Sequence, residues 1–353
     1  MPVAGKPNIK KIVYFVGIDV SKYELDFALL KGTKLLFHRE IKNNPDEINQ
    51  FMLEVKALPG FSPNKVIFCM ENSGFYCNHL LNALRKLKAP VVLENPIHIK
   101  KSLGLTREKH DRIDAIRIAQ FAQRNREEHR FWTPYRPVLE LLRSLSVLRD
   151  RLINTANKIN IPIVDTQSFL PAAIQKSNLQ LCKKSFSALK ADLKSVESKI
   201  DTIIKNDEHL KTLKKLITSV PGVGPVTALQ IIITTNEFKG ITDPRKFACY
   251  AGIAPFKTES GLFRSRAKVS PIANRKMKSL LHMCALKAIT IDPELRSYYL
   301  RKTAEEKKAK MLVLNAVRNK LILRIFACLK ESRLYSTAYQ SLSVKAKIET
   351  EAL

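Results

Sequence analysis

The sequence predicts a chain in three parts: a mixed α/β N-terminal domain, a long helical arm and a mostly helical C-terminal domain. Three observations support this division. Strand-length apolar runs alternate with amphipathic segments up to residue 130, heptad-spaced apolar residues follow, and helical patterns surround a single Pro-Gly landmark in the remainder. We therefore expect domains at residues 1–130, 131–210 and 211–335, followed by a tail at 336–353.

The N-terminal domain opens with three predicted strands. Val13–Val20 is a short apolar run rich in β-branched residues, and two alternating segments, 24–30 and 34–41, flank Lys31-Gly32-Thr33 like the arms of a hairpin. Helices and strands then alternate: helix 45–58, strand 65–71, helix 75–87, strand 90–94 and helix 111–123. The order β-β-β-α-β-α-β-α predicts an RNase H-like fold. A flavodoxin-like doubly wound sheet is the alternative, against which the opening meander argues.

Two heptad seams predict the helical arm. The first seam consists of Leu141, Leu145, Leu148, Leu152 and Ile159. The second consists of Phe186, Leu189, Leu193, Val196, Ile200 and Ile203. Pro162 and Pro171 lie between them and predict an irregular connection. An intrachain helical hairpin and a dimerisation arm fit this pattern equally well.

The charge of the chain indicates a polyanionic partner. With 61 Lys and Arg against 32 Asp and Glu, the net charge is +29, while a hydrophobic content of 45% is that of a globular protein. Nucleic acid is the default partner of such a protein. No secretory h-region, membrane-length apolar run or C-x-x-C pair is visible. We therefore expect a cytoplasmic protein without a zinc site.

Four acidic residues predict a metal site in the N-terminal domain. Asp19 interrupts the first apolar strand, and Glu71 ends the fourth, which lies beside the first in an RNase H-like sheet. Asp111 and Asp114 are three apart and share one helix face. Carboxylates that converge repel one another, a divalent cation relieves this repulsion, and oxygen-only ligands favour Mg²⁺ or Mn²⁺. The cluster predicts phosphoryl transfer on nucleic acid; for any one residue alone, an ordinary surface acid is the alternative.

The segment Val220-Pro-Gly-Val-Gly224 lies between two helical patterns. It resembles the hairpin of helix-hairpin-helix DNA-binding elements, in which Gly222 and Gly224 would let the backbone approach a phosphate. A plain tight connection between helices is the alternative.

A basic segment follows the sequence Ser260-Gly261. Its predicted phosphate-binding cations are Arg264, Arg266, Lys268, Arg275, Lys276 and Lys278. A serine hydroxyl becomes a nucleophile only when its proton is removed or its target is activated. The segment alone therefore does not distinguish a phosphate contact from a nucleophile.

Taken together, these motifs resemble those of the DEDD transposases of bacterial insertion sequences, the "one-ten" family, to which pilin-gene DNA invertases are related. The resemblance extends from about residue 13 to about residue 330. It rests on Gly17-Ile-Asp-Val-Ser21, Glu71-Asn-Ser-Gly74, Lys109-His-Asp-Arg-Ile-Asp-Ala115, Val220-Pro-Gly-Val-Gly224, Tyr250-Ala-Gly-Ile-Ala-Pro255 and Ser260-Gly261.

This resemblance implies a RuvC-like domain whose acids Asp19, Glu71, Asp111 and Asp114 bind Mg²⁺, and a coiled-coil arm. It also implies a C-terminal domain in which Ser260 attacks DNA to form a 5′-phosphoserine link. Members are homo-oligomers, dimers or tetramers, whose active sites combine the acids of one protomer with the serine of another. A structured bridge RNA pairs with target and donor DNA, so we expect a bacterial, nucleoid-associated recombinase.

The sequence departs from the family pattern after the serine. Val269-Ser-Pro-Ile-Ala-Asn274 keeps the usual serine and asparagine but has Pro271 and Ala273 where lysine and glycine are common. Thr258, Ser265 and Ser270 are therefore alternative nucleophiles.

Two other functions are compatible with the residues. One is a RuvC-like endonuclease or Holliday junction resolvase that uses activated water, and the other is a basic nucleic-acid-binding protein without activity.

Overall fold

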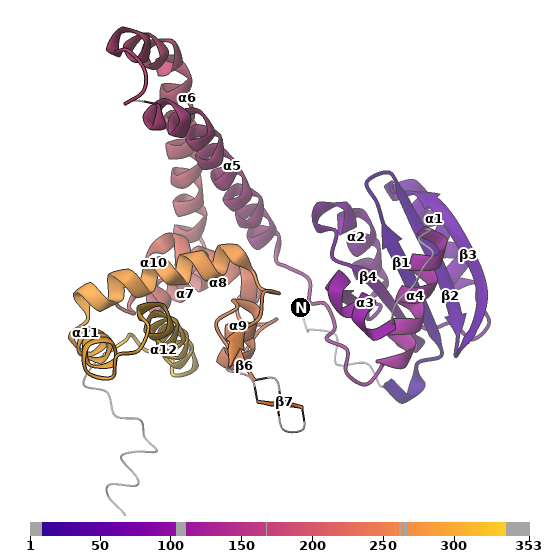
Figure 1. The fold of residues 1–353 in the computed structure, drawn as a ribbon. Helices are drawn as coiled ribbons and strands as arrows, with labels where there is room; N and C mark the ends of the chain where they lie inside the picture. The colour runs from indigo at the N-terminus through magenta and orange to yellow at the C-terminus, as the bar shows by residue number, and fades with distance from the viewer. Residues whose placement is uncertain are drawn as a thin grey trace, which may run out of the picture. The chain divides into compact units, whose positions relative to one another are not determined.

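The computed structural model describes residues 9–103, 111–166, 168–257, 259–260, 263–264 and 267–336. The chain divides into two compact units, with the boundary between Pro134 and Tyr135 (Figure 1). The helical arm and the C-terminal helices fall into the same unit. Predicted residues 104–110, Thr258, Ser265 and Arg266 lie outside the described part of the chain.

The first unit contains a five-stranded mixed sheet. Its strands are β1 (Tyr14–Val20), β2 (Glu24–Lys31), β3 (Lys34–Lys42), β4 (Val66–Glu71) and β5 (Val91–Glu94), in the spatial order β3-β2-β1-β4-β5. The pairs β1–β2 and β2–β3 are antiparallel, whereas β1–β4 and β4–β5 are parallel. This is the opening meander followed by crossovers that the sequence predicts for a RuvC-like sheet.

Helices cover both faces of this sheet. The helices are α1 (Pro45–Lys56), α2 (Asn78–Leu87), α3 (Pro96–Leu103) and α4 (Asp111–Arg124), with 3-10 turns at Ile9–Lys11, Pro63–Lys65 and Gly74–Cys77. Alternation along β1 divides its side chains between two cores. Val16 and Ile18 pack with residues of α1 and α2, and Phe15 packs with residues of α4. Asp19 is four residues after Phe15 in the same strand, so it lies on the same face of the sheet, the one covered by α4.

The arm consists of α5 (Pro137–Asp165) and α6 (Ala172–Lys205), which pack side by side (Figure 1). The predicted seam of α6 is buried or half-buried throughout. The predicted seam of α5 is wrong at two positions, because Leu141 and Leu148 are 46% and 42% exposed and Leu142 is buried instead.

The predicted irregular connection does not begin at Pro162, because this residue does not end the helix. It lies near the C-terminus of α5, where Thr166 closes the last turn onto the Pro162 carbonyl with its N–H and its Oγ1 at 3.1 and 2.8 Å.

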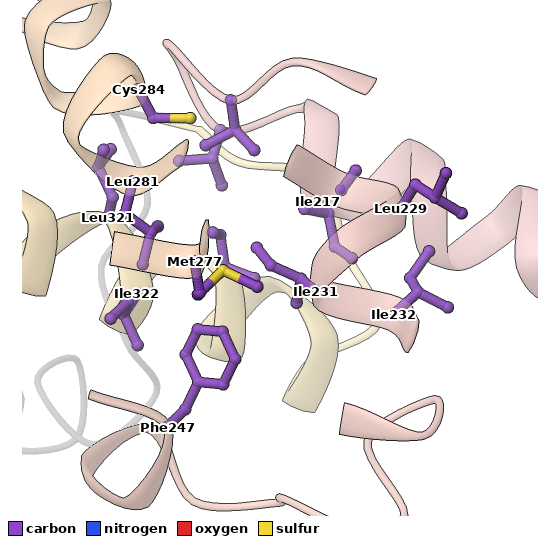
Figure 2. Packing of buried hydrophobic residues seen from close by; sticks show 14 of the residues in the cluster. Ile217, Leu229, Ile231, Ile232, Phe247, Met277, Leu281, Cys284, Leu321 and Ile322 are labelled. Carbon is purple, nitrogen blue, oxygen red and sulfur yellow. The ribbon is translucent and has the colours of Figure 1, made fainter. Parts of the chain in front are cut away.

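The rest of the second unit is a helical domain. Its helices are α7 (Glu208–Thr218), α8 (Pro225–Thr235), α9 (Pro244–Tyr250), α10 (Arg275–Ile291), α11 (Pro293–Leu300) and α12 (Lys310–Lys330), with a π-helical turn at Arg301–Glu305. Figure 2 shows the core that these helices share, where Ile231, Phe247, Met277 and Leu321 meet. No helix in the described ranges is long and apolar enough to cross a membrane.

Two short antiparallel pairs of strands interrupt these helices. β6 (Pro255–Phe256) pairs with β9 (Lys268–Val269), and β7 (Glu259–Ser260) pairs with β8 (Phe263–Arg264). The sequence patterns did not predict these strands, because each has only two residues and two residues are too few to display a period.

Candidate active site

The four predicted acids come from three adjacent elements of the first unit. Asp19 lies near the end of β1 and Glu71 is the last residue of β4, the parallel neighbour of β1. Asp111 and Asp114 occupy the first turn of α4, the helix that packs on this face of β1. Because parallel strands end at the same edge of a sheet, Asp19 and Glu71 share that edge.

A glycine brings the acid-bearing helix against the strand. A Cβ atom added to Gly17 would lie 2.2 Å from both the Ala115 carbonyl oxygen and the Ala119 nitrogen of α4. The backbone of α4 therefore rests directly on β1, two residues before Asp19 and one residue after Asp114. A glycine inside an apolar strand, as Gly17 is, signals close backbone approach in the sequence, but only the structure shows that α4 is the element that approaches.

The electrostatics of Asp19 show that the acids lie close together. Burial, together with the negative charges of Asp111, Glu71 and Asp114, raises the pKa of Asp19 to about 6. The Val20 N–H, which donates to Asp19 Oδ1 at 3.0 Å, acts in the opposite direction. At neutral pH the cluster therefore holds a carboxylate that is poorly solvated and repelled by its neighbours.

Two cations border the cluster. Burial raises the pKa of Glu71, and the nearby charge of Lys100 on α3 opposes this shift. Arg117 donates from Nη1 to Asp114 Oδ1 at 3.1 Å, one turn further along α4. These contacts offset part of the negative charge but leave Asp19 without a cationic partner among the described residues.

The residues present fit a divalent cation in charge and in donor type. The cluster offers carboxylate oxygens alone, the ligands that Mg²⁺, Mn²⁺ and Ca²⁺ prefer. Within the described residues, no three His, Cys, Asp or Glu side chains are gathered into a group that could hold a metal ion. The fit therefore rests on the kind of donors and on the repulsion that raises the pKa of Asp19.

The predicted nucleophile lies in the second unit. Ser260 is exposed on β7, where it pairs with Phe263 of β8. Of the alternative hydroxyls, Ser270 accepts a hydrogen bond on its Oγ from the Ile272 N–H at 3.1 Å. Lys268 is exposed on β9.

The segment that carries Ser260 is fixed at both ends by one pair of residues. Asn274, the N-cap of α10, accepts from the Met277 N–H at 2.8 Å and donates from Nδ2 to the Tyr250 hydroxyl at 2.8 Å. The Asn274 N–H also donates to the Tyr250 carbonyl at 2.9 Å. Both residues lie in motifs of the sequence, where an asparagine directly before a helical pattern is the signal of a helix N-cap.

The predicted cations of α10 differ in their surroundings. Lys276 forms an ion pair with Asp150 of α5 at 2.5 Å and donates to the Ser146 hydroxyl at 3.2 Å. It thus joins α10 to the arm. Arg275 is exposed and Lys278 is half-buried on the same helix.

The two glycines of the predicted hairpin also differ. Gly222 has φ +86°, and a Cβ there would lie 2.7 Å from the Cys284 carbonyl oxygen and 2.8 Å from Ala288 of α10. Close packing of helices therefore explains Gly222 without a ligand. Gly224 is the N-cap of α8, and a Cβ there would meet no atom within 4 Å. Packing therefore does not require a glycine at this position.

Two family models match the chain, one over the first unit and most of α5 and the other within the second unit. Residues 16–163 match the transposase model for the DEDD enzymes of IS110, and residues 214–300 match the model described as the transposase IS116/IS110/IS902 family. The first match includes Asp19, Glu71, Asp111 and Asp114, and the second includes Gly222 and Ser260. The chain is therefore similar to IS110-type transposases over these two ranges.

Known proteins that resemble the chain are distant in sequence. An uncharacterized 43.6 kDa protein of insertion element IS110 from Streptomyces coelicolor is 27% identical over 43% of this chain and 36% of its own length. A pilin gene-inverting protein from Moraxella bovis is 20% identical over 90% of this chain and 96% of its own length. The match spans less than half the length of the first two relatives, the proteins of IS110 and IS116. Among solved structures, Thermus thermophilus RuvC in complex with a Holliday junction aligns with 34% of this chain and 99% of that chain, at 18% identity and a TM-score of 0.28.

Proposed function

We propose that this chain, which is similar to IS110-type transposases over two ranges, is the recombinase of an insertion sequence. It would cut and rejoin DNA by phosphoryl transfer, with the four acids holding a divalent cation and Ser260 acting as nucleophile. The observation that carries the proposal is the acid cluster. Asp19 has a pKa raised to about 6 by burial and by three other carboxylates, on a chain whose first domain matches a DEDD transposase model. A structural role does not require four like charges at one sheet edge.

The acids would bind the cation through carboxylate oxygens, from β1, β4 and α4. Such a cation, Mg²⁺ or Mn²⁺, neutralises charge on the phosphate and on the leaving oxygen during in-line displacement. The close packing of α4 on Gly17 would hold Asp111 and Asp114 on the same side of the sheet as Asp19 before any ligand binds. Arg117 orients the Asp114 carboxylate through its 3.1 Å hydrogen bond.

The serine step would transfer the phosphoryl group of DNA from a 3′ oxygen to Ser260. The Ser260 Oγ forms a bond to phosphorus, the bond from phosphorus to O3′ breaks, and the serine proton ends on the released 3′-hydroxyl. The product is a 5′-phosphoserine link, which conserves the energy of the phosphodiester for rejoining. The exposure of Ser260 on a strand pair supports this role, as do the exposed cations Lys268 and Arg275 that follow it in the sequence.

The partners would be target and donor DNA, a structured bridge RNA that selects both, and further copies of the chain. The net charge of +29 supports two polyanionic partners better than one. The acids and Ser260 belong to different compact units, which supports an active site assembled from several protomers.

The direct test is cleavage of DNA that contains the element's ends by the purified full chain, with any RNA that co-purifies. We expect strand cleavage that requires Mg²⁺ or Mn²⁺, is abolished by Asp19→Asn, and leaves protein covalently attached to the 5′ end. Ser260→Ala should abolish the attachment, whereas Ser270→Ala should not.

Free 5′-phosphate ends without an adduct would contradict the serine step and would indicate hydrolysis by a RuvC-like nuclease or resolvase. Cleavage unchanged in Asp19→Asn would contradict the role of the acids. A discrete RNA in the purified protein supports RNA guidance, and activity that persists after RNase treatment contradicts it.

A further inference from the structure

A second group of polar residues lies at the same edge of the sheet as the acids. β3 runs parallel to β1, so the residue that follows it, Asn43, also lies at this edge. Asn43 connects three segments: its N–H donates to the Tyr23 carbonyl at 2.7 Å, and its Nδ2 donates to the carbonyls of Ser21 and Tyr76 at 2.9 and 3.0 Å. The turn after the Asp19 strand and the segment after Glu71 are thereby held together.

These residues border a hollow of about 370 Å³, which we call the Tyr23 pocket. It is lined by Lys22, Tyr23, Glu24, Lys42, Asn43 and Asn44. Pockets for small organic ligands begin at about 300 Å³, so the space suits a single nucleoside and is too small for a base pair with its backbones.

The ring of Tyr23 is the unusual feature of this pocket. The residue is 70% exposed, and Lys22 places its Nζ 4.6 Å from the ring centroid. The ammonium group occupies one face of the ring, and the high exposure of the residue leaves ring surface available for stacking. The chain thus exposes a flat apolar surface four residues after Asp19 without using it in its own core.

The lining offers the groups that a nucleotide uses. Lys22 and Lys42 supply positive charge for backbone phosphates, and the carboxylate of Glu24 accepts from an exocyclic amino group. An aromatic side chain stacks on the face of any base and so binds single strands with little sequence preference. Bases inside a duplex are covered on both faces, so only an unpaired nucleotide can use Tyr23.

We propose that the Tyr23 pocket binds one unpaired nucleotide of the DNA strand, with its base stacked on Tyr23 and its phosphates near Lys22 and Lys42. The inference rests on the proposed function, because the acids at this edge are proposed to act on DNA. A nucleotide held in the pocket would fix the strand beside these acids. It also requires local separation of the duplex near the cut.

The test compares binding of the full chain to single-stranded and duplex DNA in buffer with EDTA, by fluorescence anisotropy and by the quenching of 2-aminopurine in the single strand. The variants are Tyr23→Ala and Tyr23→Phe. The control is Phe169→Ala, which removes an aromatic ring from a residue outside the pocket that is 84% exposed. We expect Tyr23→Ala to weaken single-strand binding by about fivefold or more and to reduce the quenching. Tyr23→Phe and Phe169→Ala should remain close to the unchanged chain, and duplex binding should not change.

A paired test addresses the lysines. Lys22→Ala and Lys42→Ala should weaken single-strand binding, whereas Lys34→Ala, which removes an exposed lysine from the opposite end of β3, should have a smaller effect. Thermal unfolding of each variant controls for folding, which we expect to be intact because the hydrogen bonds of Asn43 go to backbone atoms.

Equal weakening of single-strand and duplex binding in Tyr23→Ala would overturn the inference, and so would unchanged quenching. An effect confined to single-stranded RNA would also overturn it. These outcomes are distinct from failure of the proposed function, because the binding assay contains no metal and requires no cleavage. If the unchanged chain cleaves DNA and Tyr23→Ala binds single-stranded DNA as tightly as the unchanged chain does, the role of the Tyr23 pocket is refuted and the proposed function is not.

Discussion

At the scale of single residues, Asp19 combines a structural penalty with a proposed function. Its carboxylate is partly buried near Asp111, Glu71 and Asp114, and this raises its pKa to about 6 from the usual 3.8. Stability is therefore lost at the position where the acids gather. Such a penalty is typical of functional sites, where ligands or substrates supply the missing charge.

The first prediction concerns Asp19→Asn in metal-free buffer. Because the folded pKa is raised, the folded state holds this proton more tightly than the unfolded state, so ionisation of Asp19 opposes folding. The penalty is absent below about pH 4, grows up to about pH 6 and is constant above. Removing the charge should therefore stabilise the chain at pH 8, by ~1–2 kcal/mol after allowance for solvent screening.

Chemical denaturation at pH 8 and pH 4 measures this effect, with Asp192→Asn, an exposed acid of α6, as the control. The gain should disappear at pH 4, and added Mg²⁺ should stabilise the unchanged chain more than Asp19→Asn. A destabilised Asp19→Asn at pH 8 would show that the acids are not crowded.

Gly17 is the second residue with a specific prediction. The methyl group of Gly17→Ala would lie 2.2 Å from backbone atoms of α4, so the helix must move away from β1. We expect a loss of ~1–3 kcal/mol or more from overpacking. We also expect a larger relative loss of cleavage than of DNA binding, because Asp111 and Asp114 move with the helix.

Gly224→Ala provides the comparison, because its methyl group would meet no atom within 4 Å. It should cost at most ~1 kcal/mol, since alanine is a poorer N-cap of α8 than glycine, and weakening of DNA binding would favour the predicted hairpin function. Full activity in Gly17→Ala would show that the position of α4 does not set the geometry of the acids.

At the scale of elements, one charged network joins the helices of the second unit. Arg136, the N-cap residue of α5, donates from Nε to Glu237 at 2.8 Å and from Nη1 to Asp207 at 2.8 Å. Asp207 is the N-cap of α7, and Glu237 follows α8 with a fully buried side chain. The network thereby fixes the base of the arm to the helical domain.

The third prediction tests this network. Among the described residues, Arg136→Met leaves the buried Glu237 carboxylate with Lys239, at 2.9 Å, as its ion-pair partner, and we expect a loss of ~3–5 kcal/mol in the free energy of unfolding. Adding Glu237→Gln to Arg136→Met should recover part of the loss, because it removes the uncompensated charge. The exposed pair Arg39–Glu54 serves as the control, where Arg39→Met should change stability by less than ~1 kcal/mol.

The elements also show the limits of heptad reasoning. The seam of α6 was predicted correctly, but that of α5 was displaced at Leu141 and Leu148. An apolar residue at heptad spacing can face either the partner helix or the outside, and the burial of Leu142 decides between them. Leu141 and Leu148 remain exposed on α5. The alternative interpretation of the arm, in which it contacts another protomer, therefore stays a prediction.

At the scale of the whole molecule, the two compact units divide the proposed chemistry. The acids belong to the first unit and Ser260 to the second. If one active site combines the acids of one protomer with the serine of another, two different inactive variants can complement each other. This is the basis of the fourth prediction.

We expect a mixture of Asp19→Asn and Ser260→Ala chains to recover cleavage, up to about one quarter of the sites in a randomly mixed dimer-based assembly. The recovery is measured as covalent adduct and should depend on exchange of protomers. Mixing Asp19→Asn with Glu71→Gln is the control and should recover nothing, because both changes affect the same half of the site. No recovery in the first mixture would indicate that each protomer supplies its own complete site.

The sequence by itself predicted the order of the strands and helices of the first unit, apart from α3, and it singled out the four acids as a candidate site. It could do so because period-two and period-3.6 patterns are local, and because a carboxylate such as Asp19 inside an apolar run is conspicuous in one dimension. The resemblance of the motifs added the roles proposed for Ser260 and for the partners.

Only the tertiary structure decided which residues hold these features in place. The contact of Gly17 with α4, the connection of three segments by Asn43 and the closing of the Ser260 segment by Asn274 all join residues far apart in the chain. It also separated Gly222, which is explained by packing, from Gly224, which is open. The physical reason is that steric fit and pKa shifts depend on distances in space, which spacing along a chain does not determine.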